Sequence, residues 1–265
     1  MAAHDLRADL ELALALADAA DAQTLPSFDA TGLDVRRKAD RTHVTAADLA
    51  AERAIRVLLG ERRPNDAILG EEYGATQAAS RRWIVDPIDG TANFLRGVPV
   101  WGTMIALEID GAVRLGVVSM PAMGRRWWAA SGLGAWTNAP DGSRRIQVSE
   151  VDDLDDASIS FQSIGQWRDA GRLDALLALQ DAVWRDRAYG DVWSYMLLAE
   201  GRLEFVGEFD VKEYDIAAAA AIVREAGGRF TSFEGDETIA TGSAVASNGV
   251  LHERFLEILH GGTSR

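Results

Sequence analysis

Two carboxylates stand where an apolar stretch of the chain breaks off. Residues 83–91 read Trp-Ile-Val-Asp-Pro-Ile-Asp-Gly-Thr, so Asp86 and Asp89 close an apolar strand. Pro87 has no N–H and a fixed φ, and it takes the chain out of a strand ladder, so that both carboxylates and the Ile88 carbonyl can face one point. Mg²⁺ prefers such a set of oxygen ligands. The stretch therefore predicts a magnesium site at the end of a strand.

Two further acids are available to the same site. Glu71 follows a short apolar pair, and Asp215 begins an alanine-rich helix. Carboxylates gathered without cations would repel each other by about 4 kcal/mol per pair, at roughly 4 Å and an effective dielectric constant near 20. A cluster therefore implies bound metal or raised pKa values. Spacing alone leaves open the alternative that Asp86 and Asp89 are turn residues and that Asp215 is a helix N-cap.

A phosphate site is predicted beside the metal. Gly90 has no side chain that would block a ligand. If Thr91 opens a helix, the free N–H groups of its first turn favour a bound anion. Metal and phosphate would then be neighbours.

The elements that must hold these residues are predicted from periodicity and turn signals. Amphipathic helices are expected over residues 5–22 and from Thr45 to about Gly60, and the pair Asp110-Gly111 predicts a hairpin. In the second half of the chain, strands and helices alternate. The expected strands are 33–37, 68–69, 83–85, 103–109, 112–118, 127–130, 158–161, 187–189, 203–206, 229–232 and 244–247, and the further helices are 170–183, 191–200, 215–226 and 250–260.

Composition excludes several kinds of chemistry and partner. The chain of 265 residues has no cysteine, which rules out thiolate nucleophiles, iron–sulfur clusters, Cys-ligated zinc and disulfides. Its net charge of −14 disfavours nucleic acid, because that binding depends on basic residues that displace counterions. No stretch has the roughly 20 consecutive apolar residues that span a bilayer, and the N-terminus lacks the basic start of a signal peptide. We therefore expect a cytoplasmic protein that binds neither nucleic acid nor membrane.

Three motifs, in order along the chain, resemble the signatures of the inositol monophosphatase family. They are residues 70–72 (Gly-Glu-Glu), 86–94 (Asp-Pro-Ile-Asp-Gly-Thr-Ala-Asn-Phe) and 214–218 (Tyr-Asp-Ile-Ala-Ala), and the likeness covers nearly the whole chain. Tyr214 stands where the family usually has Trp. The resemblance implies an α+β fold, an alternating αβαβα layered sandwich, built as one phosphatase domain with two sub-halves at about 1–150 and 151–265. It also implies a homodimer.

The resemblance assigns the metal ligands residue by residue. Glu71, Asp86 and the carbonyl of Ile88 would bind one Mg²⁺ ion. A second ion would be bound by Asp86, Asp89 and Asp215, and Glu71 would help to hold a weaker third. Two or three ions per site are therefore expected.

The same resemblance assigns the residues that handle water and phosphate. Asp48 and Thr91 would orient and deprotonate the attacking water, with Glu71 also in the catalytic set. The amides of Gly90 and Thr91 would cradle the phosphate. Asp48 has a rival role as a cap of the helix that follows Thr45, and the sequence leaves both roles open.

Within the family, shorter segments are most similar to the histidinol-phosphate phosphatases of actinobacterial type. These segments are residues 97–101, 125–130 and 187–191. Asp191 and Glu208 would receive the cationic end of histidinol phosphate, and Asp215 would complete the substrate site. The resemblance implies a Mg²⁺-dependent phosphomonoesterase that hydrolyses L-histidinol phosphate in histidine biosynthesis. Trp101 and Trp193 are the tryptophans expected to line its pocket.

Several alternatives stay open at this point. The substrate could be inositol 1-phosphate or a broader range of sugar phosphates, or the fold could serve a regulatory protein without catalysis. Asp191 is also a good N-cap for a helix over 192–200. A haloacid-dehalogenase-type phosphatase with an aspartyl nucleophile is a further rival, but its two aspartates lie two residues apart, whereas Asp86 and Asp89 lie three apart.

Overall fold

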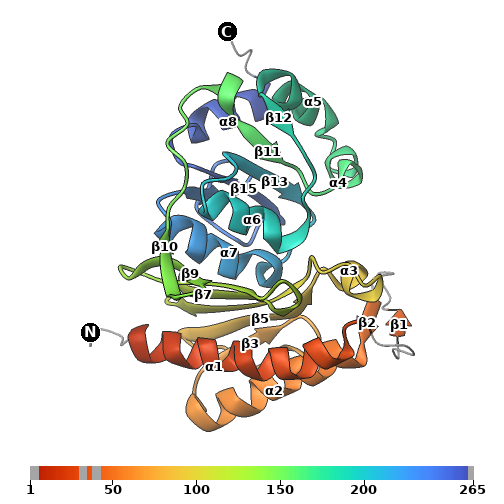
Figure 1. The fold of residues 1–265 in the computed structure, drawn as a ribbon, viewed down its shortest axis with the longest axis vertical. Helices are drawn as coiled ribbons and strands as arrows, with labels where there is room; N and C mark the ends of the chain where they lie inside the picture. Colours follow the sequence, from red (N-terminus) through yellow and green to blue (C-terminus); the bar gives the residue numbers. More distant parts are fainter. Residues whose placement is uncertain (1–5, 30–34, 38–42, 262–265) are drawn as a thin grey trace.

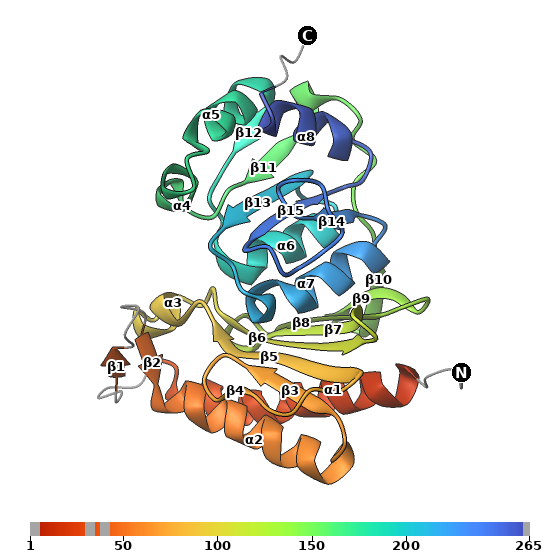
Figure 2. The ribbon, with the colours of Figure 1, turned by 180° about the vertical axis from the view of Figure 1, so that it is seen from behind.

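The structure is a stack of five layers in which helices and sheets alternate. The computed structural model describes residues 6–29, 35–37 and 43–261. From one end to the other, the order is a helix pair, an eight-stranded sheet, a second helix pair, a five-stranded sheet and an outer group of three helices (Figures 1 and 2). The α+β fold and the αβαβα order expected from the sequence are thereby confirmed. The helices, in layer order, are α1 (Leu6–Thr24) and α2 (Ala46–Arg62), then α6 (Asp191–Ala199) and α7 (Glu213–Glu225), then α4 (Ile164–Asp169), α5 (Leu173–Ala182) and α8 (His252–Leu259).

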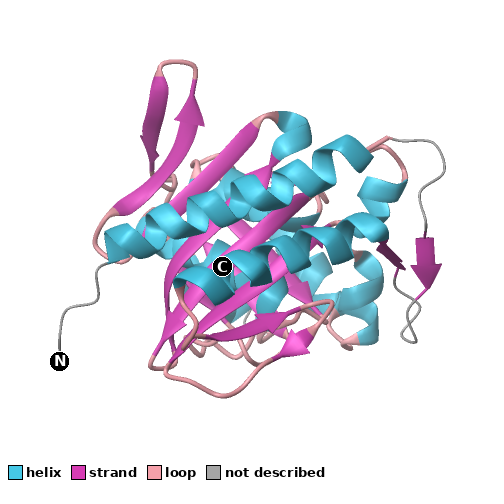
Figure 3. Ribbon diagram, turned by 90° about the horizontal axis from the view of Figure 1, so that it is seen from below, coloured by secondary structure: helices cyan, strands magenta, loops and turns pink. Residues whose placement is uncertain are grey.

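The first sheet is antiparallel except where β3 and β5 pair in parallel. Its strand order is β10-β9-β8-β7-β6-β5-β3-β4, and α1 and α2 cross its outer face (Figure 3). Asp110 and Gly111 both have positive φ, 52° and 78°, as a two-residue hairpin between β6 and β7 requires, so the predicted hairpin is confirmed. The strands are β3 (Ala67–Gly70), β4 (Gly74–Ala75), β5 (Arg81–Asp89), β6 (Gly102–Ile109), β7 (Ala112–Met120), β8 (Arg125–Ala130), β9 (Gly134–Ala139) and β10 (Gly142–Ile146).

The second sheet is smaller and mixed. β11 pairs in parallel with β12 and β13, whereas β15 is antiparallel to its neighbours. Its order is β12-β11-β13-β15-β14, with β11 (Ser158–Ser160), β12 (Arg185–Asp186), β13 (Phe205–Phe209), β14 (Arg229–Thr231) and β15 (Ser243–Ser247). A two-stranded ribbon of β1 (Val35–Arg37) and β2 (His43–Thr45) precedes α2. No helix in these described ranges combines the length and apolarity needed to cross a bilayer.

Helix α7 packs directly on the first sheet. Its run of alanines is buried, and these small side chains allow the helix backbone to approach the strands closely. The closest approach is at Gly116 of β7, where an added Cβ would lie 2.3 Å from the carbonyl oxygen of Ala218. This contact positions the N-terminus of α7, which carries Asp215.

Gly116→Ala is expected to destabilise the protein by about 3 kcal/mol, because a methyl group forced into a closed contact moves backbone on both sides. Gly60→Ala is the matched control: Gly60 lies in α2 and nothing stands within 4 Å of its missing Cβ, so alanine should stabilise the helix by up to about 1 kcal/mol. Urea unfolding of both variants measures the difference. Equal stability of Gly116→Ala and wild type would contradict the close packing of α7 on β7.

Some predicted elements are wrong. Residues 187–189 form no strand, because the edge strand β12 ends at Asp186. The helix predicted over 170–183 is the shorter helix α5, which begins only after Gly171, whose φ of 70° does not fit a helix. The helix α4, which ends at Asp169, was not predicted. The strand predicted at 203–206 lies at 205–209. Residues 134–139 and 142–146, where no strand was predicted, form β9 and β10.

Two expectations fall partly on residues that the structure does not describe. Residues 33 and 34 of the strand predicted at 33–37, and residue 5 of the helix predicted at 5–22, lie outside the described ranges. The rest of each segment is a strand and a helix, respectively.

Candidate active site

The end of β5 leaves regular pairing where the central motif begins. Asp86 lies opposite Met104 of β6 and Asp89 lies opposite Gly102, so three steps along β5 match two along β6. Pro87, between the two acids, has no N–H to give to a ladder and favours this bulge. The irregularity brings Asp86 and Asp89 to the end of the strand, as the sequence predicted.

Glu71 and Asp215 reach this strand end from neighbouring elements. Glu71 follows β3, the parallel neighbour of β5, and its N–H donates to the Val85 carbonyl at 3.1 Å. Asp215 is the third residue of α7, and its Oδ2 accepts the Lys212 N–H at 2.7 Å. Asp215 is therefore not the N-cap that the alternative interpretation proposed, because Lys212 holds that position.

Burial and nearby negative charges raise the pKa values of three of the four acids. Burial, followed by the charges of Glu71, Asp89 and Asp215, raises the pKa of Asp86 well above its ordinary value. Burial likewise raises the pKa of Asp89, with neighbouring acids adding to the effect, and raises the pKa of Asp215 to about 7. Such a group is stable in its ionised form only when cations offset its charge. Oxygen donors of this kind fit a hard divalent cation such as Mg²⁺.

The acids do not form a complete ligand shell. Among the residues that the structure describes, no three Asp, Glu or His side chains are grouped so that they could hold a metal ion. Three of the carboxylates accept backbone N–H groups: Asp86 from Ile88 at 3.0 Å, Asp89 from Val192 at 2.7 Å, and Asp215 from Lys212. The structure thus brings the predicted ligands to one region, and their role as ligands stays a prediction.

The two carboxylate oxygens of Asp48 contact different residues. Its Oδ2 accepts the Thr45 N–H at 2.8 Å and the Thr45 hydroxyl at 2.5 Å, which forms a capping box at the start of α2. Its Oδ1 lies 3.5 Å from the hydroxyl of Thr91, the first residue of the short helix α3 (Thr91–Leu95). Burial raises the pKa of Asp48, which makes its carboxylate a better proton acceptor at neutral pH than an exposed one. The capping role is therefore confirmed, and the role of Asp48 in deprotonating water stays a prediction.

Asp191 is fixed by hydrogen bonds from two amide side chains. Its Oδ2 accepts from Asn93 Nδ2 at 2.5 Å, and its Oδ1 accepts from Gln162 Nε2 at 3.3 Å. It is the first residue of α6, after the N-cap Gly190, and its carboxylate accepts no N–H of that helix. The alternative that Asp191 is a helix N-cap is therefore wrong; the Val192 N–H binds Asp89 instead.

Gly90 connects the predicted phosphate site with Asp191. It is the N-cap of α3 and has a φ of 82°. A Cβ added at Gly90 would lie 3.0 Å from the Val100 carbonyl oxygen and 3.3 Å from Asp191 Cγ. Only glycine fits a backbone that passes this close, so the start of α3 and the Asp191 carboxylate are direct neighbours.

Glu208 supplies a second acid next to Asp191. It is buried on β13, and its Oε1 accepts the Tyr195 hydroxyl at 2.5 Å. Burial raises the pKa of Glu208 to about 8; the Tyr195 hydrogen bond opposes this shift, whereas the charges of Asp215 and Asp191 add to it. The predicted substrate acids thus border the predicted metal acids.

Sequence reasoning missed three residues of this site, Asn93, Gln162 and Tyr195. Asn93 stands inside the central motif, and Tyr195 lies one helical turn after Asp191. Their positions in the sequence could therefore have placed both residues near the site. Gln162 follows a strand and has no local signal.

The expectation for the tryptophans is wrong at one position. Trp101 is fully buried against Phe28 and Phe94, with ring centroids 5.3 and 4.9 Å away, so it belongs to the core and lines no open pocket. Trp193 is half-buried and meets the ring of Tyr189 edge-on at 5.9 Å. Its place in a pocket stays a prediction.

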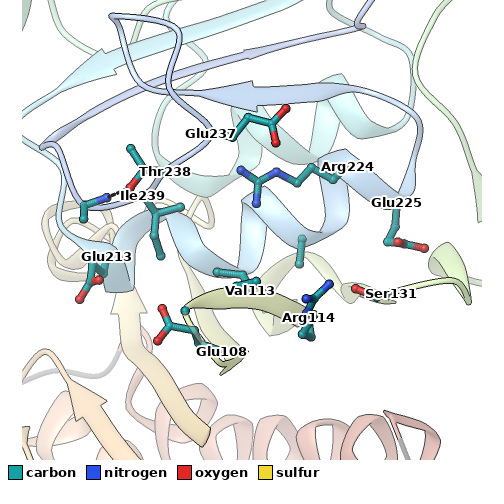
Figure 4. A pocket seen from close by; sticks show the side chains of 14 residues that line it. Glu108, Val113, Arg114, Ser131, Glu213, Arg224, Glu225, Glu237, Thr238 and Ile239 are labelled. Carbon is teal, nitrogen blue, oxygen red and sulfur yellow. Dashed lines mark hydrogen bonds between the residues drawn. The ribbon is translucent and has the colours of Figure 1, made fainter. Parts of the chain in front are cut away.

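A separate cavity of about 390 Å³ lies along α7, beside the hairpin of β6 and β7 (Figure 4). Arg224 of α7 extends into it on the side of Glu237. At its other end, Arg82 pairs with Glu108 and Glu213 at 2.8 and 2.9 Å. None of the predicted site residues lines this cavity, so it is distinct from the candidate active site.

Known proteins resemble this chain over nearly its full length. The chain is 51% identical to a histidinol-phosphatase of Mycobacterium tuberculosis over 262 residues, which cover 98% of this chain and 99% of that protein. It is 48% identical to a histidinol-phosphatase of Streptomyces coelicolor, with 95% and 97% covered. Among solved structures, the extragenic suppressor protein suhB of Bartonella henselae has a TM-score of 0.86 and 29% identity, and the match covers 97% of this chain and 100% of that one.

The family itself is matched from end to end. Residues 5–264 fit the profile of the inositol monophosphatase family. This range includes all three motifs that suggested the resemblance and every residue of the candidate site. The chain therefore belongs to the inositol monophosphatase family.

Proposed function

We propose that the chain is a phosphoric monoester hydrolase that converts L-histidinol phosphate to L-histidinol and inorganic phosphate. The observation that carries the proposal is the second pair of acids, Asp191 and Glu208, beside the carboxylate group at the end of β5. Histidinol phosphate has an ammonium group and a titratable imidazole at the end opposite its phosphate, and acids suit both. The relatives at 51% and 48% identity carry the name histidinol-phosphatase, which supports the same substrate.

The family is metal-dependent, typically with Mg²⁺. Glu71, Asp86 and the Ile88 carbonyl would hold one ion; Asp86, Asp89 and Asp215 would hold a second, and Glu71 would support a third. When bound, the ions lower the pKa of water, offset the charge of the acids so that a phosphate can approach, and stabilise the negative charge on the leaving oxygen.

The chain's own residues orient the water and the phosphate. The Thr91 hydroxyl lies 3.5 Å from Asp48 Oδ1 and 3.1 Å from the Ile88 carbonyl oxygen. It can therefore hold the attacking water, give its hydroxyl proton to Asp48 and take up a proton from the water in exchange. The raised pKa of Asp48 suits it to accept that proton. The amides of Gly90 and Thr91 would bind the phosphate oxygens. Attack by water requires no phospho-enzyme.

A phosphate-release assay with Mg²⁺ tests the proposal. We expect kcat/KM for L-histidinol phosphate to exceed that for inositol 1-phosphate by at least about tenfold, because a charge-assisted contact is worth 1.4 kcal/mol or more. A preference for inositol 1-phosphate would favour the sugar-phosphate alternative. Protein inert towards a panel of phosphomonoesters would favour a regulatory role on the same fold.

Lithium provides a second test of the metal site. The family resemblance leads us to expect that Li⁺ lowers the rate of phosphate release by occupying a Mg²⁺ site. KCl at the same concentration is the control for ionic strength. Equal rates in the two salts would count against the proposed metal ligands.

We further propose that the enzyme acts in the cytoplasm as a homodimer, as the resemblance implies. Light scattering coupled to size-exclusion chromatography measures the assembly directly. A mass of one chain, 28.6 kDa, would show that it acts alone.

A further inference from the structure

Two residues at the candidate substrate site have an uncommon backbone conformation and bind each other. Gln162 and Asp191 both have a φ of 47°, in the left-handed region that residues other than glycine rarely adopt. The Asp191 N–H donates to Gln162 Oε1 at 2.6 Å, and Gln162 Nε2 donates to Asp191 Oδ1 at 3.3 Å. Strained conformations persist only where the surroundings hold them, and they cluster at functional sites. The pair therefore points to a role beyond packing.

The second oxygen of Asp191 is held from the other half of the chain. Asn93 Nδ2 donates to Asp191 Oδ2 at 2.5 Å and to the Val100 carbonyl at 2.7 Å. Asn93 belongs to α3, beside the first sheet, whereas Gln162 follows β11 of the second sheet. The carboxylate is thus clamped between two neutral amides, one from each half of the fold.

This clamp leaves the negative charge of Asp191 available. Among the described residues, no Lys, Arg or His forms an ion pair with Asp191. Burial raises the pKa of Asp191, whereas the hydrogen bonds from Gln162 and Asn93 lower it. The two amides orient the carboxylate and carry no charge that would neutralise it. The charge can therefore be met by a cation on a ligand.

We propose that Gln162 is a positioning residue for substrate preference: its carboxamide holds the Asp191 carboxylate in the direction from which the positively charged end of the substrate binds. This inference rests on the proposed function. Only a carboxamide fits the task, because one planar group must accept the backbone N–H and donate to the carboxylate. Glutamate offers no donor and methionine offers neither bond.

Gln162→Met and Gln162→Gly test the role. Methionine keeps the approximate size and removes both hydrogen bonds, whereas glycine removes the side chain and also relieves the left-handed strain. For both variants we expect the ratio of kcat/KM for L-histidinol phosphate to that for inositol 1-phosphate to fall about tenfold, the effect of losing about 1.4 kcal/mol of oriented charge contact. The loss should appear as a rise in KM for L-histidinol phosphate, because Gln162 does not touch the reacting atoms. Calorimetric titration with L-histidinol should show a similar loss of affinity.

Ser163→Ala is the matched control. Ser163 caps α4 through its hydroxyl, which accepts the Gly165 N–H at 3.2 Å, and it has no hydrogen bond to Asp191. Loss of the Ser163 hydroxyl loosens the loop that also carries Gln162. An equal fall in the kcat/KM ratio for Ser163→Ala would therefore overturn the specific role of the Gln162 amide. The unfolding temperature of Gln162→Gly should be no lower than that of wild type. A change in its substrate preference could then not be attributed to lost stability.

The outcomes distinguish this inference from the function on which it rests. Wild type that prefers inositol 1-phosphate would overturn both. Wild type that prefers L-histidinol phosphate, with variants that keep the same ratio and the same L-histidinol affinity, would overturn only the role of Gln162.

Discussion

Asp89→Asn should reduce phosphate release by more than about 100-fold while the protein stays folded. Loss of a group that merely supports a metal ligand lowers metal affinity or activity by about 10 to 100-fold, so loss of a proposed ligand should lower activity further. Asparagine keeps the size and an oxygen that can still accept the Val192 N–H, now 2.7 Å from Asp89 Oδ2. The substitution therefore removes the charge and spares the contact with α6. Steady-state rates at saturating Mg²⁺ measure the effect.

The same substitution should stabilise the metal-free protein above neutral pH. Burial and the neighbouring acids raise the pKa of Asp89 in the folded chain. A raised pKa means that the folded chain holds this proton more tightly than the unfolded chain does, so stability is lost as the pH rises from the ordinary carboxyl pKa through the raised one. Asparagine has no proton to lose, so in EDTA at pH 8 the variant should unfold at a higher temperature than wild type.

Asp153→Asn is the control for Asp89→Asn. Asp153 also accepts a backbone N–H, that of Asp155 at 3.1 Å, but it is exposed and far along the chain from the acid group. It should change neither the rate nor the metal-free stability. If Asp89→Asn kept wild-type activity, this result would contradict the proposed role of Asp89 as a metal ligand. If it were inactive but also less stable in EDTA, misfolding would explain the result instead.

The chemistry-bearing residues were predictable because they stand in short segments with strong local signals. Asp86 and Asp89 follow an apolar strand and flank Pro87, and a proline inside such a run ends or distorts a strand wherever it occurs. The structure shows the bulge at that position. Asp48 was predictable for the same reason, because a capping box depends on residues three apart.

The contacts that orient these residues were not predictable from local pattern. Asn93 and Asp191 are 98 positions apart, and Gln162 and Asp191 are 29 apart, so only the completed fold brings them together. The missed strands β9 and β10 have a related cause. The residues of β10 up to Arg145 are exposed and polar, so they lack the apolar alternation that identifies a strand.

An acidic chain that acts on phosphate esters needs cations near some of its carboxylates, so the partners of each carboxylate matter. Burial, followed by nearby negative charges, raises the pKa values of Asp86, Asp89 and Asp215, so these acids create a demand for cations. Asp191 instead has neutral amide partners on both oxygens. The first group suits metal ions that stay with the enzyme, whereas the second suits a cation that arrives and leaves with the substrate. In the proposed function, this division would place the phosphate end of the substrate at β5 and its cationic end at α6.

Asp191→Asn should lower kcat/KM for L-histidinol phosphate by about 10 to 100-fold, because a hydrogen bond to a charged group is worth about 1.5–3 kcal/mol. Asparagine tolerates the left-handed backbone at this position, so the fold should not suffer. The kcat/KM for inositol 1-phosphate should fall much less, because that substrate carries no positive charge. Asp191→Thr also removes the acid and should impair the same substrate more, but its β-branched side chain does not suit the left-handed backbone, so asparagine is the cleaner test.

Asp110→Asn is the matched control, since Asp110 is also an aspartate in the left-handed region, with a φ of 52°, but lies in the hairpin of β6 and β7. Its kinetics should equal those of wild type for both substrates. Equal losses on both substrates for Asp191→Asn would mean that Asp191 supports the phosphate end through Gly90, its neighbour at the start of α3, and takes no part in recognising the cation. A loss confined to L-histidinol phosphate is the result that follows from an unpaired, amide-held carboxylate facing the substrate.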